Sequence, residues 1–546
     1  MGKKAHKKQT KIWTFEDFDG FVNDDDTFEV SSYDDAGSLH GFESGSDVSM
    51  SGFTMEHIPE GFLEEDFDEN STDASTDFAG MTDEELAKKM SERMQEKVCP
   101  DTDDLKEESK EEKGEKRLSD VKMARKYMQF FDFVNIDGTP HVYDPEYGIW
   151  RILAASTGYK LLRRLAPEEI KDSINRRSLG EILEWIAADE NVEYIDSYDI
   201  NNSCAMNFKN GAFYVDSGKP VFDRKSMMFR HYVDADYVGE DCDGSLFLEF
   251  LDTTFGGDRY QIALFQEMVG YCFSEKRDLK VSFLLYGPSN SGKSVVGNLM
   301  SKLTGEEFTS DLTMSELNER FGPVKLTGKF LNVGSEMSTT SRISGDKFKR
   351  LVGNDRVNVE EKNIPGFPIR NTAAMVFLGN SFPSFSMTED PKSINERIVF
   401  LPFLNSVPRE KWIPHLEKKL FEEASFIAAW AMEGFARLRR RDYIFSRCRA
   451  SELLRAQYLS KSFPEYYFVT TYLQADPYGK VSTKEMDLKY KNFCLATEMP
   501  VRDRVAWFDV LSKEFVVQSI RGIDFGEKKN LRGFSGVSFK KGGASA

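Results

Sequence analysis

The stretch "VSFLLYGPSNSGKSVVGNLM", residues 281–300, decides the fold class of this chain. It opens with five apolar residues in six, which predicts a buried strand, and a helical pattern begins at about residue 293. The loop between them fits the pattern GxxxxGK(S/T) with Gly287, Pro288, Ser289, Asn290, Ser291, Gly292, Lys293 and Ser294. A strand before this pattern and a helix after it are the context that marks a phosphate-binding loop.

The chemistry of phosphate binding accounts for these residue types. The glycines allow backbone N–H groups to turn inward around phosphate oxygens, and Lys293 reaches the β and γ phosphates. The Ser294 hydroxyl is a ligand for Mg²⁺, and the following helix presents its positive N-terminus to the anion. We therefore predict that residues 287–294 bind a nucleoside triphosphate with Mg²⁺.

Further short apolar runs, "KFLNV", "TAAMVFL" and "RIVFLPF", follow the loop and are separated by polar turns. Strands that alternate with loops and helices predict an α/β fold with a parallel sheet. Hydrolysis also needs an acid near Mg²⁺ and a group that positions water. Glu336 follows the first run and Asn380 follows the second, at the strand end where a γ-phosphate would lie. Arg397 opens the third run and is a candidate to reach the nucleotide of a neighbouring subunit.

Each of these three residues also has a plainer interpretation. Glu336 could be an exposed loop residue, Asn380 a turn residue before Ser-Phe-Pro, and Arg397 a surface charge. The ordered series with Lys293 favours the catalytic interpretation.

The charge of the chain is concentrated at its N-terminus. Residues 1–120 hold 14 Lys and Arg against 34 Asp and Glu, whereas the whole 546-residue chain has a net charge of −19. The remaining body is therefore close to neutral and can carry local basic stripes, so the acidic composition does not exclude nucleic-acid binding.

Cysteine usage and hydropathy predict an intracellular, cytoplasmic protein. The six cysteines are scattered without a CxxC pair, which indicates reduced thiols and no zinc site. No run of about 18 apolar residues occurs, so we expect no membrane partner.

The pattern along the chain divides it into five parts. Residues 1–118 are acidic and rich in Ser and Gly, which predicts a disordered acidic tail that either solubilises the chain or docks on a partner. The other four are an α+β accessory domain (119–270), an ATPase core (271–408), a helical extension of the core (409–460) and a C-terminal domain of three helices and a hairpin (461–546).

The sequence resembles the superfamily 3 helicases, the compact AAA+-like motors of small replicons. More narrowly, it is similar to the helicase half of the primase-helicases of phages, plasmids, satellite elements and poxviruses. The matching stretches are "LLYGPSNSGKS", "RFGPVKLTGKFLNVGSE", "FKRLVGNDRVNVEEKNIPGFPIRNTAAMVFLGNSFPSF" and "NERIVFLPF". The resemblance covers about 120–546 and is specific in 281–405. It implies an AAA+-like core and a winged-helix-like DNA-binding domain at 461–546, and it suggests replication proteins as partners that the acidic tail could bind.

The resemblance also implies roles for individual residues. Lys293 and Ser294 would bind ATP and Mg²⁺. Glu336 would be the Walker B acid that polarises the attacking water, and it could also serve as a ligand of Mg²⁺. Asn380 would be the sensor amide that orients water, and Arg397 the arginine finger offered to the next subunit. Residues 353–370 would form a hairpin in the channel of a homohexamer, with Arg356 and Lys362 on DNA phosphates.

Two features depart from the family pattern. Ser335 stands where related motors often have a second acid before Glu336. Residues 1–118 are too few and too polar for a primase domain, so we predict no primer synthesis by this chain.

Three functions remain open on the sequence alone. The first is an ATP-dependent, ring-forming helicase that acts on single-stranded or forked DNA in the replication of a viral or mobile element. The second is an origin-binding initiator that uses ATP only to assemble and recruits host proteins. The third, a nucleotide or metabolite kinase, is disfavoured by the Asn380 and Arg397 pattern.

Overall fold

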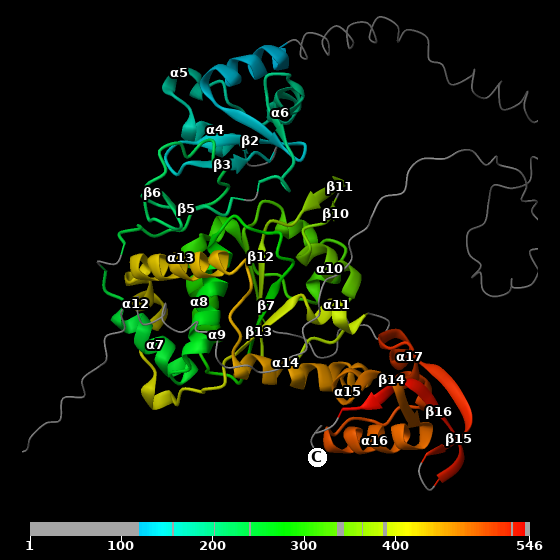
Figure 1. Cartoon of the computed structure of the whole chain (residues 1–546). Helices are drawn as coiled ribbons and strands as arrows, with labels where there is room; N and C mark the ends of the chain where they lie inside the picture. Colours follow the sequence, from blue (N-terminus) through cyan, green and yellow to red (C-terminus); the bar gives the residue numbers. More distant parts are fainter. Residues whose placement is uncertain are drawn as a thin grey trace, which may run out of the picture. The chain divides into compact units, whose positions relative to one another are not determined.

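The computed structural model describes residues 119–154, 158–200, 202–239, 242–335, 343–362, 364–385, 390–525 and 528–540. The predicted acidic tail, residues 1–118, lies outside the described residues. All described residues belong to one compact unit. Its architecture is mixed α/β with a parallel sheet and many helices (Figure 1).

The first part of the described chain is a small α+β region that begins with a helix over residues 119–130. Its sheet has the order β3-β2-β1-β4, with β1, β2 and β3 antiparallel and β4 parallel to β1. Asp137 and Gly138 both have positive φ at the β1–β2 turn, as the Asp-Gly signal predicts. The elements are β1 (Phe133–Ile136), β2 (Thr139–Asp144), β3 (Ile149–Ile152), α4 (Gly158–Leu165), α5 (Glu168–Lys171), α6 (Leu179–Ala188), β4 (Tyr194–Ile195), β5 (Ala205–Phe208) and β6 (Gly211–Tyr214).

The central part is built on a five-stranded, all-parallel sheet with the order β13-β7-β12-β9-β8. This confirms the parallel sheet predicted from the apolar runs. The strands are β7 (Ser282–Tyr286), β8 (Thr309–Ser310), β9 (Leu331–Gly334), β12 (Ala374–Gly379) and β13 (Ile398–Pro402). The hairpin of β10 (Arg356–Glu361) and β11 (Ile364–Arg370) lies between β9 and β12 along the chain and forms a separate two-stranded sheet, as predicted for residues 353–370.

Helices cover both faces of the parallel sheet (Figure 1). Leu284, Met375 and Phe400 belong to a core cluster with residues of α10 (Gly345–Val352), α11 (Pro391–Asn395) and α14 (Arg449–Ser462). On the opposite face lie α9 (Lys293–Thr304) and α8 (Arg259–Phe273), and α13 (Ala424–Arg440) packs along α8. The remaining elements are α7 (Ser245–Phe255), η1 (Glu306–Phe308), η2 (Glu316–Asn318), η3 (Pro323–Leu326), η4 (Arg409–Lys411) and α12 (Leu416–Glu422).

The last part of the chain follows the element order α-β-α-α-β-β and closes on its own core cluster. Its sheet is antiparallel with the order β14-β16-β15. The three helices and the terminal hairpin agree with the sequence prediction, which did not include β14. The elements are α15 (Pro464–Tyr472), β14 (Leu473–Ser482), α16 (Thr483–Ala496), α17 (Arg504–Glu514), β15 (Gln518–Phe525) and β16 (Lys528–Phe539).

Glu275, which follows α8, is the centre of a buried polar network. It is 1% exposed, and it accepts bonds from the Arg230 backbone and guanidinium and lies 3.2 Å from His231 Nδ1. Burial alone would raise the pKa of Glu275, but the Arg230 charge and the hydrogen bond from His231 outweigh it and lower the pKa to about 2. The His231 ring stacks on Phe330 with ring centroids 3.5 Å apart. The network therefore ties residues 230–231 to the region that carries the parallel sheet.

Among the described residues, no helix combines the length and the apolar character that crossing a membrane requires.

Candidate functional site

The Gly-rich loop predicted from the sequence lies at the carboxyl edge of the parallel sheet, between β7 and α9. β7 pairs with β12 on one side and β13 on the other, so the ends of these three strands meet there. The Gly287 N–H donates to the Gly379 carbonyl over 3.1 Å. A Cβ on Gly287 would lie 1.9 Å from the Phe403 carbonyl oxygen, so this position accepts no side chain without movement. The first glycine of the motif is thus required by packing between strands.

The loop reaches α9 through two residues in the left-handed region of backbone conformation. Asn290 has a φ of 63° and Gly292 a φ of 92°. Gly292 is the N-cap residue of α9, so the loop ends where the positive end of the helix dipole begins. Ser294, in the first turn of α9, is exposed to solvent. The arrangement combines backbone donors, a helix N-terminus and an accessible hydroxyl, which are the components of an anion site.

Lys293 folds back over the loop that precedes it. Its Nζ donates to the carbonyl oxygens of Gly287 and Pro288 over 2.8 and 2.6 Å and to Ser291 Oγ over 3.1 Å. Burial lowers the pKa of Lys293 below its ordinary value of 10.5. All three acceptors are neutral, so none of these hydrogen bonds balances a positive charge on Lys293.

The segment that follows β13 covers the loop, which the sequence analysis did not predict. The Ser406 hydroxyl donates to the Ser289 carbonyl and the Val407 N–H to the Asn290 carbonyl, each over 2.9 Å. The only available signal was the position of these residues directly after the third apolar run. This segment holds the far side of the loop in place.

The structure places Asn380 beside the loop. Gly379 ends β12 and pairs with Tyr286, the last residue of β7, so the exposed Asn380 follows at the same edge as Gly287. β9 ends at Gly334, opposite Phe377, and Ser335 is the last described residue before a gap. Glu336 lies outside the described residues.

Arg397 directly precedes β13, so it lies at the amino-terminal ends of the parallel strands, whereas the loop lies at their carboxyl ends. Its carbonyl accepts from the backbone and hydroxyl of Ser282, the first residue of β7, over 2.8 Å each. The loop begins after Tyr286, so β7 separates the two; four residue steps along a strand span about 13 Å. The Arg397 Nη1 donates to the Ser393 carbonyl over 2.7 Å, and the buried Nε has no partner among the described residues. The structure therefore does not bring Arg397 to the loop of its own chain.

The two residues predicted to contact DNA both lie on the β10–β11 hairpin. Arg356 begins β10 and forms an ion pair with Asp196 over 3.0 Å. Lys362 lies at the hairpin turn and is exposed. The hydrogen bond from the Tyr198 backbone, assisted by Arg370 and Arg356, lowers the pKa of Asp196, which therefore stays an anion. The first predicted contact is thus engaged by a carboxylate and the second is open to solvent.

A magnesium site would have to draw on few protein ligands. Within the described ranges no group of three or more His, Cys, Asp or Glu side chains is placed to hold a metal ion. The Ser294 hydroxyl is a hard oxygen ligand of the kind Mg²⁺ binds together with phosphates and waters. The residues present thus fit a metal that arrives with a nucleotide.

Comparisons with known proteins give one family match and several matches to solved structures. Residues 285–397 match the model of a family of unknown function, DUF5906. The A form apo structure of the NrS-1 C-terminal region has 13% sequence identity, covers 75% of this chain and 97% of its own length, and has a TM-score of 0.40. An apo structure of the same region (305–718) has 12% identity, covers 74% and 96%, and has a TM-score of 0.39.

Proposed function

We propose that this chain is an ATP-dependent, ring-forming DNA helicase of the superfamily 3 type that acts in the replication of a viral or mobile element. The observation that carries the proposal is the edge of the parallel sheet, where the 287–294 loop, the start of α9 and Asn380 lie together. The sequence resemblance supplies the reaction class, and this geometry is compatible with it.

In this proposal, Lys293 leaves the carbonyls of Gly287 and Pro288 and binds the β and γ phosphates of ATP. Asn380 orients the attacking water, which Glu336 polarises as the general base. Mg²⁺ held by Ser294 and the phosphates would neutralise charge that develops on the transferring phosphoryl group.

The position of Arg397 supports a ring. An arginine finger must reach the γ-phosphate, and Arg397 lies at the other edge of the sheet from its own loop. A head-to-tail contact between copies would bring the Arg397 edge of one subunit to the loop edge of the next, and such contacts form a ring when the rotation between copies closes. We propose a homohexamer of this kind.

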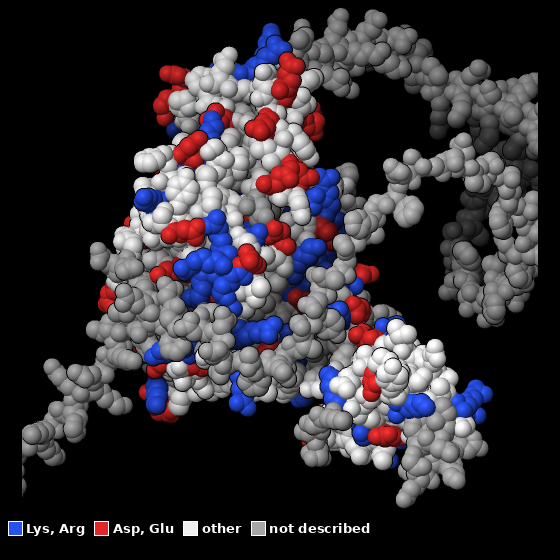
Figure 2. Space-filling view, viewed as in Figure 1, with Lys and Arg blue, Asp and Glu red and all other residues white. Residues whose placement is uncertain are grey.

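The charge distribution supports nucleic acid as the partner. In Figure 2, basic patches lie in the areas that Figure 1 labels α13 and β10–β11, interspersed with acidic side chains. We propose that Arg356 and Lys362 contact phosphates of a single strand, which gives sequence-tolerant, salt-sensitive binding. The C-terminal element order supports a winged-helix-like domain as a second contact with DNA.

Unwinding of a forked DNA duplex by the full chain tests this proposal. A helicase loses ATP-driven unwinding when Glu336→Gln removes the general base, while ATP binding persists. Glu249→Gln, an exposed acid on α7, is the matched control and should unwind normally. A parent chain that forms an ATP-dependent DNA complex but never separates strands would replace the helicase with the origin-binding initiator.

A further inference from the structure

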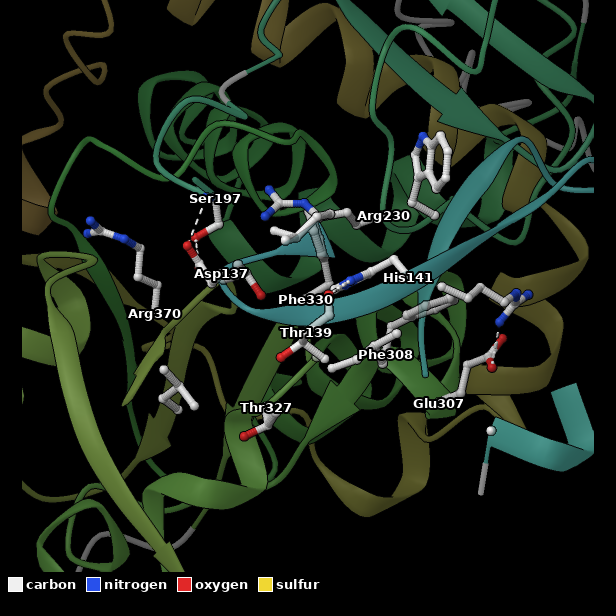
Figure 3. A pocket seen from close by; sticks show the side chains of 18 of the residues that line it. Asp137, Thr139, His141, Ser197, Arg230, Glu307, Phe308, Thr327, Phe330 and Arg370 are labelled. Carbon is white, nitrogen blue, oxygen red and sulfur yellow. Dashed lines mark hydrogen bonds and ion pairs between the residues drawn. The ribbon is translucent and has the colours of Figure 1, made fainter. Parts of the chain in front are cut away.

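A cavity of about 480 Å³ lies away from the Gly-rich loop, where β1–β3 and α4 face the segment 307–330 and β11 (Figure 3). None of the residues 287–294 lines it. Its volume falls within the range of about 300–1,000 Å³ that small-molecule sites occupy. Nothing in the reaction proposed above uses it.

Cations dominate the charged lining of this cavity. Five basic side chains line it, Arg151, Lys160, Arg164, Arg230 and Arg370, against the acidic Asp137 and Glu307. Carboxylates hold most of the guanidiniums in place, as Glu275 does for Arg230 over 2.9 Å and Asp144 for Arg151 over 2.7 Å. The paired cations are therefore fixed in orientation while most of their charge is balanced.

Lys160 supplies charge that is not balanced in this way. It is exposed on α4 and has no ion-pair or hydrogen-bond partner in the part of the chain that the structure describes. Arg230 bonds Glu275 through Nε and Nη2, which leaves Nη1 outside that pair. One free ammonium beside oriented guanidiniums suits a ligand with one phosphate better than a triphosphate.

Aromatic and neutral polar groups complete the lining. Phe308 and Phe330 are almost fully buried in the wall, whereas Phe367 on β11 lines the cavity and is only half-buried, so part of its side chain is accessible. The Thr327 hydroxyl oxygen is buried without a hydrogen-bond partner among the described residues, and Figure 3 shows Thr327 at the cavity. Burial lowers the pKa of His141 to about 4, so its ring is neutral at pH 7. These groups can stack on and hydrogen-bond a nucleobase.

We propose that this cavity binds a single nucleotide unit with one phosphate, at a site distinct from the Gly-rich loop. The phosphate lies near Lys160 and the oriented guanidiniums, and the base stacks on Phe367. The unit is either a free nucleoside monophosphate or one residue of a single strand that follows the β10–β11 hairpin, since the recognised chemistry is the same.

Binding to a full chain that carries Lys293→Ala tests the proposal, because that change weakens nucleotide binding at the Gly-rich loop. The probes are dAMP, measured by equilibrium dialysis, and a fluorescent oligo(dT) of eight nucleotides, measured by anisotropy. Lys160→Ala and Phe367→Ala change opposite walls, and each should weaken binding about tenfold, as expected for loss of a phosphate contact or a stacked base. Sensitivity of dAMP identifies a free nucleotide as the ligand; sensitivity of oligo(dT) alone identifies a strand residue.

Matched controls separate the cavity from general effects of charge and hydrophobicity. Lys171→Ala on α5 and Phe222→Ala, which removes a ring that is 96% exposed, lie outside the cavity and should bind as the parent does. Thermal unfolding checks that each variant is folded. Equal binding by the cavity variants and the controls overturns the proposal. So does a loss with Phe367→Ala but not Lys160→Ala, which assigns the effect to the hairpin.

Discussion

The Gly-rich loop and the cavity beside Phe367 both present cations, but they differ in what holds those cations. At the loop, Lys293 rests on the neutral carbonyl oxygens of Gly287 and Pro288. At the cavity, Arg230 and Arg151 are bonded to carboxylates that are almost fully buried. A phosphate can displace a neutral acceptor more easily than a paired carboxylate, since the pair has the stronger attraction.

This difference predicts that changes at the loop affect catalysis, whereas changes at the cavity ion pairs affect the stability of the fold. The loop cation is free to change partners, so its loss should affect catalysis with little effect on folding. The cavity cations are part of a buried network, so removing a carboxylate leaves an uncompensated charge and should mainly reduce stability.

The largest expected effect is on ATP hydrolysis, because the proposed catalytic site combines Lys293 of one subunit with Arg397 of its neighbour. Lys293→Ala and Arg397→Ala should each reduce ATP hydrolysis by about a thousandfold. A 1:1 mixture should regain about a quarter of the parent rate, since random assembly pairs an intact Lys293 with a neighbour's intact Arg397 at one interface in four. Phosphate release measures the rate. A mixture as inactive as either variant contradicts the trans arrangement.

The next effect is on stability at the cavity. Glu275→Ala should lower the free energy of unfolding by about 3–5 kcal/mol, because it leaves the buried Arg230 without its carboxylate partner. Glu307→Ala is the matched change, since Glu307 pairs with Arg151 but is 55% exposed, and it should cost at most about 1 kcal/mol. Urea unfolding compares the two. Equal losses would show that burial does not determine how much these ion pairs contribute to the free energy of unfolding.

Stability should also fall as the pH drops. The folded-state pKa values of Glu275 and His231 are both below their ordinary values of 4.5 and 6.5. Below about pH 6.5 the unfolded chain protonates His231 more readily than the folded chain does, and below 4.5 the same applies to Glu275. Urea midpoints at pH 8, 6 and 5 measure the decline.

A variant pair assigns the first part of that decline. His231→Gln should reduce the change between pH 8 and 5 without abolishing it, because the buried His141, whose pKa burial lowers to about 4, contributes to the same decline. His415→Gln, at an exposed histidine, should leave the change as in the parent. A midpoint that stays constant over this range would show that the buried network does not control the pH dependence.

The smallest expected effect concerns the hairpin. Lys362→Ala should weaken single-stranded DNA binding severalfold at low salt and reduce the slope of log affinity against log salt by about 1. Lys171→Ala should change neither. Anisotropy at several salt concentrations measures both. An unchanged slope would remove Lys362 from the proposed contacts.

Regions built from residues that are close together in the sequence could be predicted, and regions built from distant segments could not. The loop is contiguous, and its strand, glycines and helix start are specified within 20 residues, so its fold and the position of Asn380 followed from strand order. The three C-terminal helices were predicted for the same reason, whereas the β10–β11 hairpin was expected from the family resemblance. The parallel pairing also explains why Arg397 lies far from the loop, which spacing along the chain does not reveal.

The cavity could not be predicted because its lining comes from segments between residues 136 and 372 that are distant in sequence. Lys160 and Phe367 carry no motif, and their proximity arises only when the accessory elements pack near the hairpin. The segment at Ser406 and Val407 was missed for a similar reason, since it contacts the loop through backbone atoms that any sequence provides. The roles of Glu336, Asn380 and Arg397, the winged-helix character of the C-terminal part and the five domain boundaries stay predictions.

Whether this chain is a nucleic-acid-coupled motor is decided by its ATP hydrolysis with and without single-stranded DNA, for the parent chain and for Lys293→Ala. We expect DNA to stimulate hydrolysis by the parent severalfold and the Lys293→Ala chain to lack hydrolysis, although this variant unfolds at the parent's temperature. Hydrolysis that ignores DNA, or that survives the loss of Lys293, would contradict a nucleic-acid-coupled motor built on this loop.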